Sequence, residues 1–378
     1  MIIQSRNVYF EEKLQPLQVE IEDGKITAVL PYGFKKADKD YGDNWILPGL
    51  CDIHNHGFYM VDANHATEEG IRMWMKYLPK EGVTSTLPTT SAGVPWETLL
   101  ENVGNIAKVI EEGNEGAHIL GVHSEGPFIS QEFAGAQTLS AMVIPDNKII
   151  DDFQKACKGH LLLVMLAPEM LENMDVIRHC TEMGIRVTLG HTGATFEQCA
   201  AAREAGAVSF THTYNAMRPL NHRKPGTVGA AMYFDDMYAE LIGDTCHVSA
   251  PAAKILAKIK GKDRLISVTD SVRAKGFPVG TYDTPEGIIS VTDEEVCRLQ
   301  NGALTGSAAM LCHILGKEIN KSGIDVVTAI NSCTCNPMNM LGLGDVKGYI
   351  KQGYDADIAV LDENFDAVQT YVSGVEML

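Results

Sequence analysis

Most of this chain alternates between two patterns of hydrophobic and polar positions. From about residue 46 onward, short apolar runs rich in Val, Ile and Leu alternate with longer amphipathic stretches. A short apolar run bounded by turn residues is typical of a buried strand. The runs predict eight strands, at Trp45–His54, Val83–Thr89, His118–Glu125, His160–Ala167, Arg186–His191, Ala207–His212, Tyr238–Asp244 and Leu265–Asp270.

The stretches between these strands carry apolar residues at three- and four-residue spacing, which predicts helices. Thr67–Lys80 and Thr195–Ala205 are the clearest of them. Gly82, Gly184 and Gly206 stand where a helix should stop before the next strand. Eight strands alternating with helices predict an α/β fold of the (β/α)8 TIM-barrel type. A doubly wound open sheet is the alternative, because periodicity alone does not distinguish a closed sheet from an open one.

Both ends of the chain have a different pattern, with short strands and tight turns. Residues 1–45 contain alternating strands around the hairpin turn signal Glu22-Asp23-Gly24-Lys25. The C-terminal segment contains similar strands at Ala356–Leu361 and Ala367–Val372. Since neither end can bury a core alone, we expect both to form one small β-sandwich domain.

This interpretation divides the chain into two domains. Residues 1–45 and 346–378 make the small β-sandwich domain, and residues 46–345 make the TIM-barrel catalytic domain. Two further helices, at Ser307–Ser322 and Asp325–Cys333, connect the barrel to the C-terminal strands.

Composition indicates where the protein resides and what it does not bind. No run of 18 apolar residues appears and the N-terminus lacks a signal peptide, so we expect a cytoplasmic protein. Nine scattered cysteines form no disulfide framework, and the close pair Cys333 and Cys335 is interpreted as helical core positions rather than a metal or redox site. The net charge of −18 argues against nucleic acid and anionic membranes as partners. Any phosphate site must therefore be a local basic pocket.

Metal-binding residue types stand at the C-terminal ends of the predicted strands. They are His54, His56, Glu125, His191, His212 and Asp270. In a TIM barrel these ends converge on one face, where the active sites of such barrels lie. Four histidines and two carboxylates gathered there can hold one or two divalent ions.

The other histidines receive a weaker interpretation. His123 lies two residues before Glu125, on the same face of its strand but deeper in the barrel, so it can support the site from below. The remaining histidines fall at strand starts or on helices and are interpreted as structural: His65, His118, His160, His179 and His313.

Several longer motifs give the chain a family resemblance. Leu47-Pro48-Gly49-Leu50-Cys51-Asp52-Ile53-His54-Asn55-His56-Gly57 resembles the first-strand signature of the amidohydrolase superfamily. His123-Ser124-Glu125-Gly126-Pro127-Phe128 is similar to the segment that carries the metal-binding Glu in N-acetylglucosamine-6-phosphate deacetylases. The motifs that follow in the same order are Gly190-His191-Thr192, Thr211-His212-Thr213-Tyr214-Asn215-Ala216-Met217, Gly243-Asp244-Thr245-Cys246-His247-Val248, Val268-Thr269-Asp270, Asn336-Pro337 and Gly353-Tyr354-Asp355-Ala356-Asp357.

The resemblance implies a metal-dependent deacetylase, most simply of N-acetylglucosamine 6-phosphate. Glu125, His191 and His212 would hold the main ion, Zn or Fe. His54 and His56 would join Glu125 around a second ion, and some family members work with only one. Asp270 would be the general base and then the general acid.

The resemblance also implies a substrate pocket and a homodimer. Asn215, the Ala216 backbone, Arg223 and His247 would bind the phosphate and hydroxyls, with the Arg supplied by the neighbouring subunit. The sugar and acetyl group would be lined by Ala136, Gln137, Leu304, Thr305 and Gly306.

Elementary chemistry agrees with these roles. An acetamide is a poor electrophile, and a divalent ion makes bound water a better nucleophile near neutral pH. Asp270 can take the proton from that water and pass it to the departing nitrogen. Arg218, His222, Arg223 and Lys224 supply basic groups in an acidic chain, and the fork of an Arg suits a phosphate.

Three alternatives stay open at this point. The substrate can be the galacto epimer or another small amide, and Ser124, Arg273 and Lys275 stand where they can alter sugar or acyl specificity. A different class is an inactive regulator that binds sugar phosphates. The intact Asp270 and the full ligand set argue against the regulator, since a binding protein needs no general base.

Overall fold

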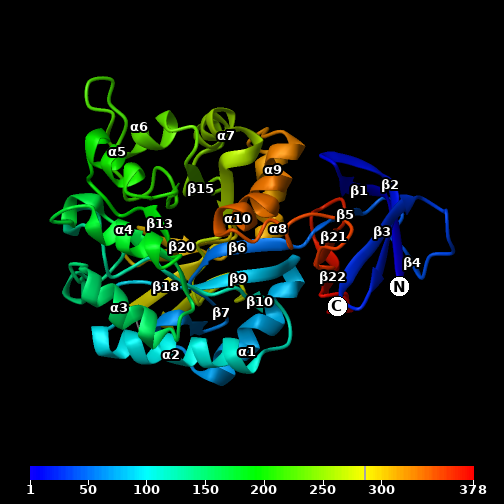
Figure 1. Ribbon diagram of the computed structural model, residues 1–378, viewed down its shortest axis with the longest axis horizontal. Helices are drawn as coiled ribbons and strands as arrows, with labels where there is room; N and C mark the ends of the chain where they lie inside the picture. Colours follow the sequence, from blue (N-terminus) through cyan, green and yellow to red (C-terminus); the bar gives the residue numbers. More distant parts are fainter. Residues whose placement is uncertain (285–286) are drawn as a thin grey trace.

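The computed structural model describes residues 1–284 and 287–378, whose strands form two large sheets lying next to each other (Figure 1). One sheet is the barrel. The other is built from both ends of the chain, and its blue and red strands lie together at the right of Figure 1, beside both termini.

Parallel strands follow one another around the barrel in chain order. They are β6 (Leu50–Asn55), β9 (Val83–Thr90), β10 (His118–Ile119), β11 (Val122–Ser124), β12 (Leu161–Leu166), β13 (Arg186–Leu189), β14 (Ser209–Phe210), β15 (Tyr238–Ile242) and β16 (Leu265–Val268). β10 and β11 both pair with β9 and share the third position. The barrel closes where Asn55 and Ser271 form a parallel bridge and the Asp270 N–H donates to the His54 carbonyl at 2.9 Å. The predicted TIM barrel is confirmed, and the open-sheet alternative is wrong.

The first predicted strand, Trp45–His54, is in fact two strands. β5 (Trp45–Pro48) pairs with β21 (Ile358–Leu361) in the sheet of the chain ends, and β6 then enters the barrel. Gly49 separates them. A side chain at Gly49 would collide with Thr84 of β9, so only glycine permits this close passage between the two sheets. Because both strands are apolar, the hydrophobic pattern shows one continuous run.

Helices surround the barrel and begin at recognisable caps. Thr67 caps α1 by accepting a hydrogen bond from Gly70, and Thr195 forms a capping box with Gln198 at the start of α5. The α-helices are α1 (Glu68–Tyr77), α2 (Trp96–Glu112), α3 (Asn147–Ala156), α4 (Asp175–Glu182), α5 (Phe196–Glu204), α6 (Gly226–Tyr233), α7 (Ala250–Arg264), α8 (Leu311–Asn320), α9 (Val326–Cys333) and α10 (Cys335–Leu341). Single 3-10 turns are η1 (Ala63–His65), η2 (Leu78–Glu81), η3 (Gln131–Phe133), η4 (Leu139–Ala141) and η5 (Pro168–Met170).

The sheet of the chain ends brings N- and C-terminal strands together around its own core. Its order is β23-β22-β21-β5-β1-β2-β3, and β4 pairs with β1. The strands not yet given are β1 (Ile2–Phe10), β2 (Lys13–Glu22), β3 (Lys25–Pro31), β4 (Lys39–Asp40), β22 (Ala367–Val372) and β23 (Val375–Glu376). Ile26, Ile46, Ile358 and Tyr371 are among the buried residues of this core. The domain boundaries at residues 45/46 and 345/346 stay a prediction.

An antiparallel insertion follows the last barrel strand and was not predicted. It consists of β17 (Gly280–Thr284), β18 (Gly287–Val291), β19 (Val296–Leu299) and β20 (Leu304–Ser307). A small hairpin of β7 (Gly57–Phe58) and β8 (Val61–Asp62) lies after β6. Because Ser307 belongs to β20, the helix predicted from this residue begins only at Leu311.

In the described part of the chain, no helix has both the length and the apolar character needed to cross a bilayer. The nine cysteines are free thiols, all buried except the partly exposed Cys246. Cys333 and Cys335 lie in α9 and α10, as expected of core positions. Burial raises the pKa of the Cys335 thiol to about 11, which leaves it unreactive.

Candidate active site

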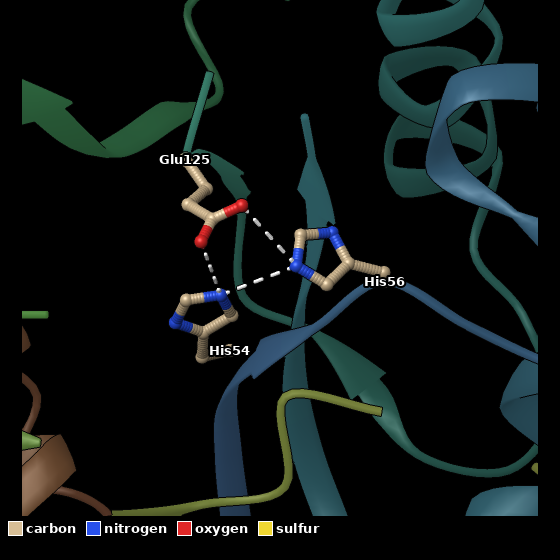
Figure 2. Close-up of side chains that lie close together, drawn as sticks. All are labelled: His54, His56 and Glu125. Carbon is tan, nitrogen blue, oxygen red and sulfur yellow. Dashed lines mark hydrogen bonds and ion pairs between the residues drawn. The ribbon is translucent and has the colours of Figure 1, made fainter. Parts of the chain in front are cut away.

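The side chains at the strand ends gather in two clusters at the C-terminal end of the barrel. His54, His56 and Glu125 form one cluster, and Glu125, His191 and His212 form the other. In each cluster the potential ligand atoms lie within 4.8 Å of one another. Figure 2 shows the first cluster, in which both imidazoles point toward the Glu125 carboxylate. Since Glu125 belongs to both clusters, the geometry allows two ions to share this carboxylate.

Three residues that follow barrel strands at this site have an unusual backbone conformation. The φ angle is +42° at His191, +29° at His212 and +47° at Asp270. Positive φ is costly for residues with a side chain and is found where surrounding structure enforces it, often at functional sites. In each case the residue stands two positions beyond the end of its strand, so the chain turns sharply there.

Hydrogen bonds determine which nitrogen of two imidazoles carries a proton. Nδ1 of His56 faces the carbonyl of Thr89 at 3.0 Å, and Nδ1 of His191 faces the carbonyl of Phe133 at 2.8 Å. A carbonyl only accepts, so each Nδ1 carries a hydrogen, and in the neutral ring each Nε2 is left with a lone pair. Those Nε2 atoms lie 3.4 and 3.0 Å from Glu125 oxygens. In the neutral rings these lone pairs face carboxylate oxygens, and a divalent cation between them would stabilise this arrangement.

The electrostatics of the cluster also favour a positive charge at its centre. Burial alone would lower the pKa of His54, but the charges of Asp270 and Glu125 raise it well above the usual value. Burial would raise the pKa of Asp270, yet His54 and His56 outweigh it and hold the pKa near about 2. Nε2 of His56 lies 3.1 Å from Oδ1 of Asp270. Imidazole nitrogens and carboxylate oxygens are the donors that divalent transition ions prefer, so the residues present fit such an ion.

A cavity of about 320 Å³ opens above these clusters. His56, Glu125, His191, His212 and Asp270 line its floor, whereas His54 is fully buried beneath it. Eight of the residues expected to contact substrate also line it: Ala136, Gln137, Asn215, Ala216, His247, Leu304, Thr305 and Gly306. The last three come from β20, so the unpredicted insertion supplies one wall of the cavity.

Two of the cavity residues have contacts that refine their expected roles. Gln137 donates from Nε2 to the Glu125 carboxylate at 2.9 Å, so it orients a potential ligand as well as facing the cavity. Nδ1 of His247 lies 2.6 Å from Asp244. Burial alone would lower the pKa of His247, but the hydrogen bond and charge of Asp244 raise it. A ring that favours its charged form suits an anionic or hydroxyl group of a ligand.

Arg223 is not brought to the cavity of its own subunit. It lies on an exposed loop after Asn221 and is absent from the cavity lining. Its neighbours His222 and Lys224 are exposed as well. The basic loop therefore presents its charges outward from the subunit.

His123 lies under the clusters, as its register predicts. Its Nδ1 donates to the carbonyl of Ile53 at 3.0 Å, and its ring centroid is 5.0 Å from that of His54. Burial lowers the pKa of His123 well below its usual value. The neutral ring therefore packs against His54 from below.

Sequence reasoning missed a glutamate and two ion pairs in and around this site. Glu240 of β15 is fully buried and contacts both His54 and the backbone of His212. The sequence did contain a signal for Glu240, which is a glutamate in the middle of an apolar strand. Charged side chains are rarely buried without partners, so such a residue indicates a polar contact in the interior. Asp62 and Arg273 form an ion pair in the cavity wall, and Lys275 pairs with Glu81 in the interior at 2.6 Å.

This barrel, with histidines and carboxylates at its strand ends, defines a class of metal-dependent hydrolases. The model of the amidohydrolase family matches residues 45–377. The chain therefore belongs to the amidohydrolase family, whose members use a divalent metal ion, and the two clusters are where donor atoms for it converge.

Relatives within the family are similar over nearly the whole chain. N-acetylglucosamine-6-phosphate deacetylase of Lysinibacillus sphaericus is 34% identical over 364 residues, covering 95% of this chain and 93% of that protein. N-acetylgalactosamine-6-phosphate deacetylase of Escherichia coli O157:H7 is 32% identical, covering 99% and 98%. Among solved structures, N-acetyl-D-glucosamine-6-phosphate deacetylase from Mycobacterium smegmatis superimposes with a TM-score of 0.93. It is 27% identical and covers 100% of this chain and 100% of that one.

Proposed function

We propose that this protein is a metal-dependent deacetylase that hydrolyses N-acetyl-D-glucosamine 6-phosphate to D-glucosamine 6-phosphate and acetate. The observation that carries the proposal is the cavity itself. Its floor combines Asp270 with the Glu125 clusters, and its wall carries Asn215 and His247. Curated relatives at 34% identity that cover most of the chain support the same chemistry.

Two sets of residues would hold the metal. Glu125, His191 and His212 form the main site, and His54 and His56 form a second site with the shared Glu125. We propose Zn²⁺ or Fe²⁺, which imidazole and carboxylate donors suit. When bound, such an ion makes a water molecule more acidic and polarises the amide carbonyl.

Asp270 would move the proton in the reaction. Its carboxylate lies within the cavity lining and is ionised at neutral pH, so its oxygens can accept a proton from the attacking water. It would then donate that proton to the sugar nitrogen as the C–N bond breaks, because an amide anion is too basic to leave unprotonated. Its Oδ1 lies 3.1 Å from Nε2 of His56, directly beside the proposed second metal site.

The rest of the cavity would recognise the sugar phosphate. Asn215, the Ala216 backbone and His247 would bind the phosphate and hydroxyl groups, and Arg223 of a second subunit would complete the phosphate site. Ala136 and Gln137, with the segment Leu304–Gly306, would line the sugar and acetyl group. The exposed position of Arg223 supports its supply to a neighbour, so we propose a homodimer.

A cytoplasmic location belongs to the same proposal. The described thiols are unpaired, as is usual in a reducing compartment.

A second substrate calls for a direct comparison, because one relative at 32% identity is an N-acetylgalactosamine-6-phosphate deacetylase. Acetate release should be measured with the 6-phosphates of N-acetylglucosamine and N-acetylgalactosamine and with both unphosphorylated sugars. We expect the highest kcat/KM for the gluco 6-phosphate. Equal rates on phosphorylated and free N-acetylglucosamine would contradict the sugar-phosphate assignment and leave only a general amide hydrolase.

A further inference from the structure

Glu240 lines no part of the cavity, yet it contacts two of the proposed ligand residues. It lies on β15 with its side chain fully buried. Its Oε2 lies 3.0 Å from Nδ1 of His54 and accepts a hydrogen bond from the backbone N–H of His212 at 3.1 Å. One oxygen therefore joins β15 to a residue of β6 and to a residue beyond β14.

The contact with His54 determines the orientation of that ring. A carboxylate oxygen accepts, so Nδ1 of His54 must carry a hydrogen, and Nε2 is left with a lone pair in the neutral ring. This Nε2 lies 3.2 Å from Nε2 of His56 and 3.5 Å from the Glu125 carboxylate. In the opposite tautomer, the Nδ1 lone pair would face Glu240 and the hydrogen would occupy the position of an ion.

His54 also differs from its neighbours in what holds it. Peptide carbonyls accept from Nδ1 of His56 and His191, whereas a buried carboxylate accepts from Nδ1 of His54. A carboxylate polarises the imidazole more strongly than a carbonyl does and makes Nε2 a better donor to a metal. The second bond, to His212, supports a backbone that has a φ of +29°.

We infer that Glu240 is a positioning residue that sets the tautomer and donor strength of His54 and thereby builds the second metal site. The inference rests on the proposed function only in that a divalent ion binds between His54, His56 and Glu125. Glu240 touches neither the substrate cavity nor the reacting groups.

The test is a calorimetric titration. Full-length protein is first freed of metal with a chelator, and Zn²⁺ is then added in the absence of substrate while the heat of binding is measured. Unmodified protein should bind two equivalents. In Glu240→Gln, the amide oxygen can still accept both hydrogen bonds but carries no charge. We expect the second equivalent to bind about 10–100-fold more weakly, the usual effect of altering such a partner, with the first equivalent nearly unchanged. Glu240→Leu and His54→Ala should both lose the second equivalent.

Glu318→Gln provides a matched control. Glu318 is also a fully buried glutamate against the barrel, but it bonds to Ser267 and to no metal-binding residue. This variant should keep both equivalents. The inference is overturned if Glu240→Gln binds both ions normally, if it weakens both equally, if Glu318→Gln shows the same loss, or if unmodified protein binds a single ion. Because no substrate is present, a failure to release acetate from any sugar phosphate would contradict the proposed function without changing this result.

Discussion

At the scale of single residues, the site depends on backbone conformations that its own contacts maintain. His191, His212 and Asp270 all have positive φ angles, which cost roughly 1–3 kcal/mol each in residues of this kind. The Asp270 N–H donates to the His54 carbonyl, and the His212 N–H donates to Glu240. The strained turns and the ligand contacts therefore stabilise each other, and loss of one side chain should affect its neighbours.

The first prediction concerns His191, whose Nε2 lies 3.0 Å from Glu125. We expect His191→Ala to lose the tightly bound ion, because two donors, Glu125 and His212, are too few for a stable site. Activity should fall by orders of magnitude, and elemental analysis of the purified variant should show the missing metal. His179→Ala is the control, because His179 pairs with Asp151 near the surface. Full metal content and near-normal turnover in His191→Ala would show that the site is misassigned.

The second prediction concerns Asp270. Asp270→Asn keeps the shape of the side chain and removes its ability to accept a proton. We expect metal content to survive and kcat to fall by roughly 10²–10⁴, the usual contribution of positioned acid–base catalysis. Metal content and acetate release should be measured on the same preparation. If the ion is lost along with the activity, Asp270 is chiefly a ligand.

At the scale of elements, the sequence predicted the barrel strands better than the boundary between β5 and β6 or the insertion β17–β20. The barrel strands are largely buried on both faces and most of them are followed by a helix, so their positions follow from the apolar runs. Burial does not tell which sheet an apolar residue joins, which is why β5 and β6 were taken as one strand. The insertion β17–β20 contains mostly half-exposed strands, whose hydrophobic pattern is too weak to predict them.

The candidate site shows the same division. His54, Glu125 and Asp270 could be found because their residue types are rare at the ends of apolar strands. Glu240 could not be assigned, since its role depends on the distance between neighbouring strands. Arg273 could be noticed as a cation near Asp270, but its ion pair with Asp62 arises from the β7–β8 hairpin, which no periodic pattern marks.

The third prediction concerns the packing of α8 against the barrel. Burial of Glu318 on α8 raises its pKa from 4.5 to about 8. The folded protein therefore holds a proton that the unfolded chain has already released, and the free energy of unfolding should decrease as the pH rises from about 4.5 to 8. Glu318→Gln is neutral throughout and should lack this decrease. One pKa unit corresponds to about 1.4 kcal/mol. Above pH 8 we therefore expect the free energy of unfolding of Glu318→Gln to exceed that of the unmodified protein by at least about 1 kcal/mol.

Urea unfolding of metal-saturated protein from pH 5 to pH 9 would measure this difference. Glu172→Gln, at an exposed position, is the control and should retain the pH dependence of the unmodified protein. An identical pH dependence in Glu318→Gln and unmodified protein would contradict the prediction.

At the scale of the whole molecule, the distribution of charge bears on the proposed recognition of a sugar phosphate. The chain carries a net charge of −18, which repels an anionic substrate at long range. The cavity of one subunit offers His247 and Asn215 at the expected phosphate side, while Arg223 lies outside it on an exposed loop. Under the proposed function, Arg223 of a second subunit would complete the phosphate site.

The last prediction tests this supply. If Arg223 contacts the 6-phosphate, Arg223→Ala removes a charge-assisted contact of roughly 1.5–3 kcal/mol. The kcat/KM for the phosphorylated sugar should then fall about ten- to a hundredfold, while the rate on the free sugar should barely change. For Arg223→Lys we expect a kcat/KM between those of the unmodified protein and Arg223→Ala, because lysine restores the positive charge but not the two-pronged hydrogen bonding of the guanidinium. Lys224→Ala, one position along the exposed loop, is the control for a general loss of basic charge.

Mixing subunits distinguishes supply in trans from supply in cis. A heterodimer of Arg223→Ala and Asp270→Asn protomers has one site with Asp270 and a partner's Arg223, and one site that lacks both. Co-expressed and differently tagged protomers, purified as the heterodimer, should therefore regain about half the activity of the unmodified dimer, although each parent variant is impaired. If Arg223 acts within its own subunit, every site of the heterodimer carries one lesion. In that case no activity beyond the mean of the two parents returns, and the shared phosphate site is wrong.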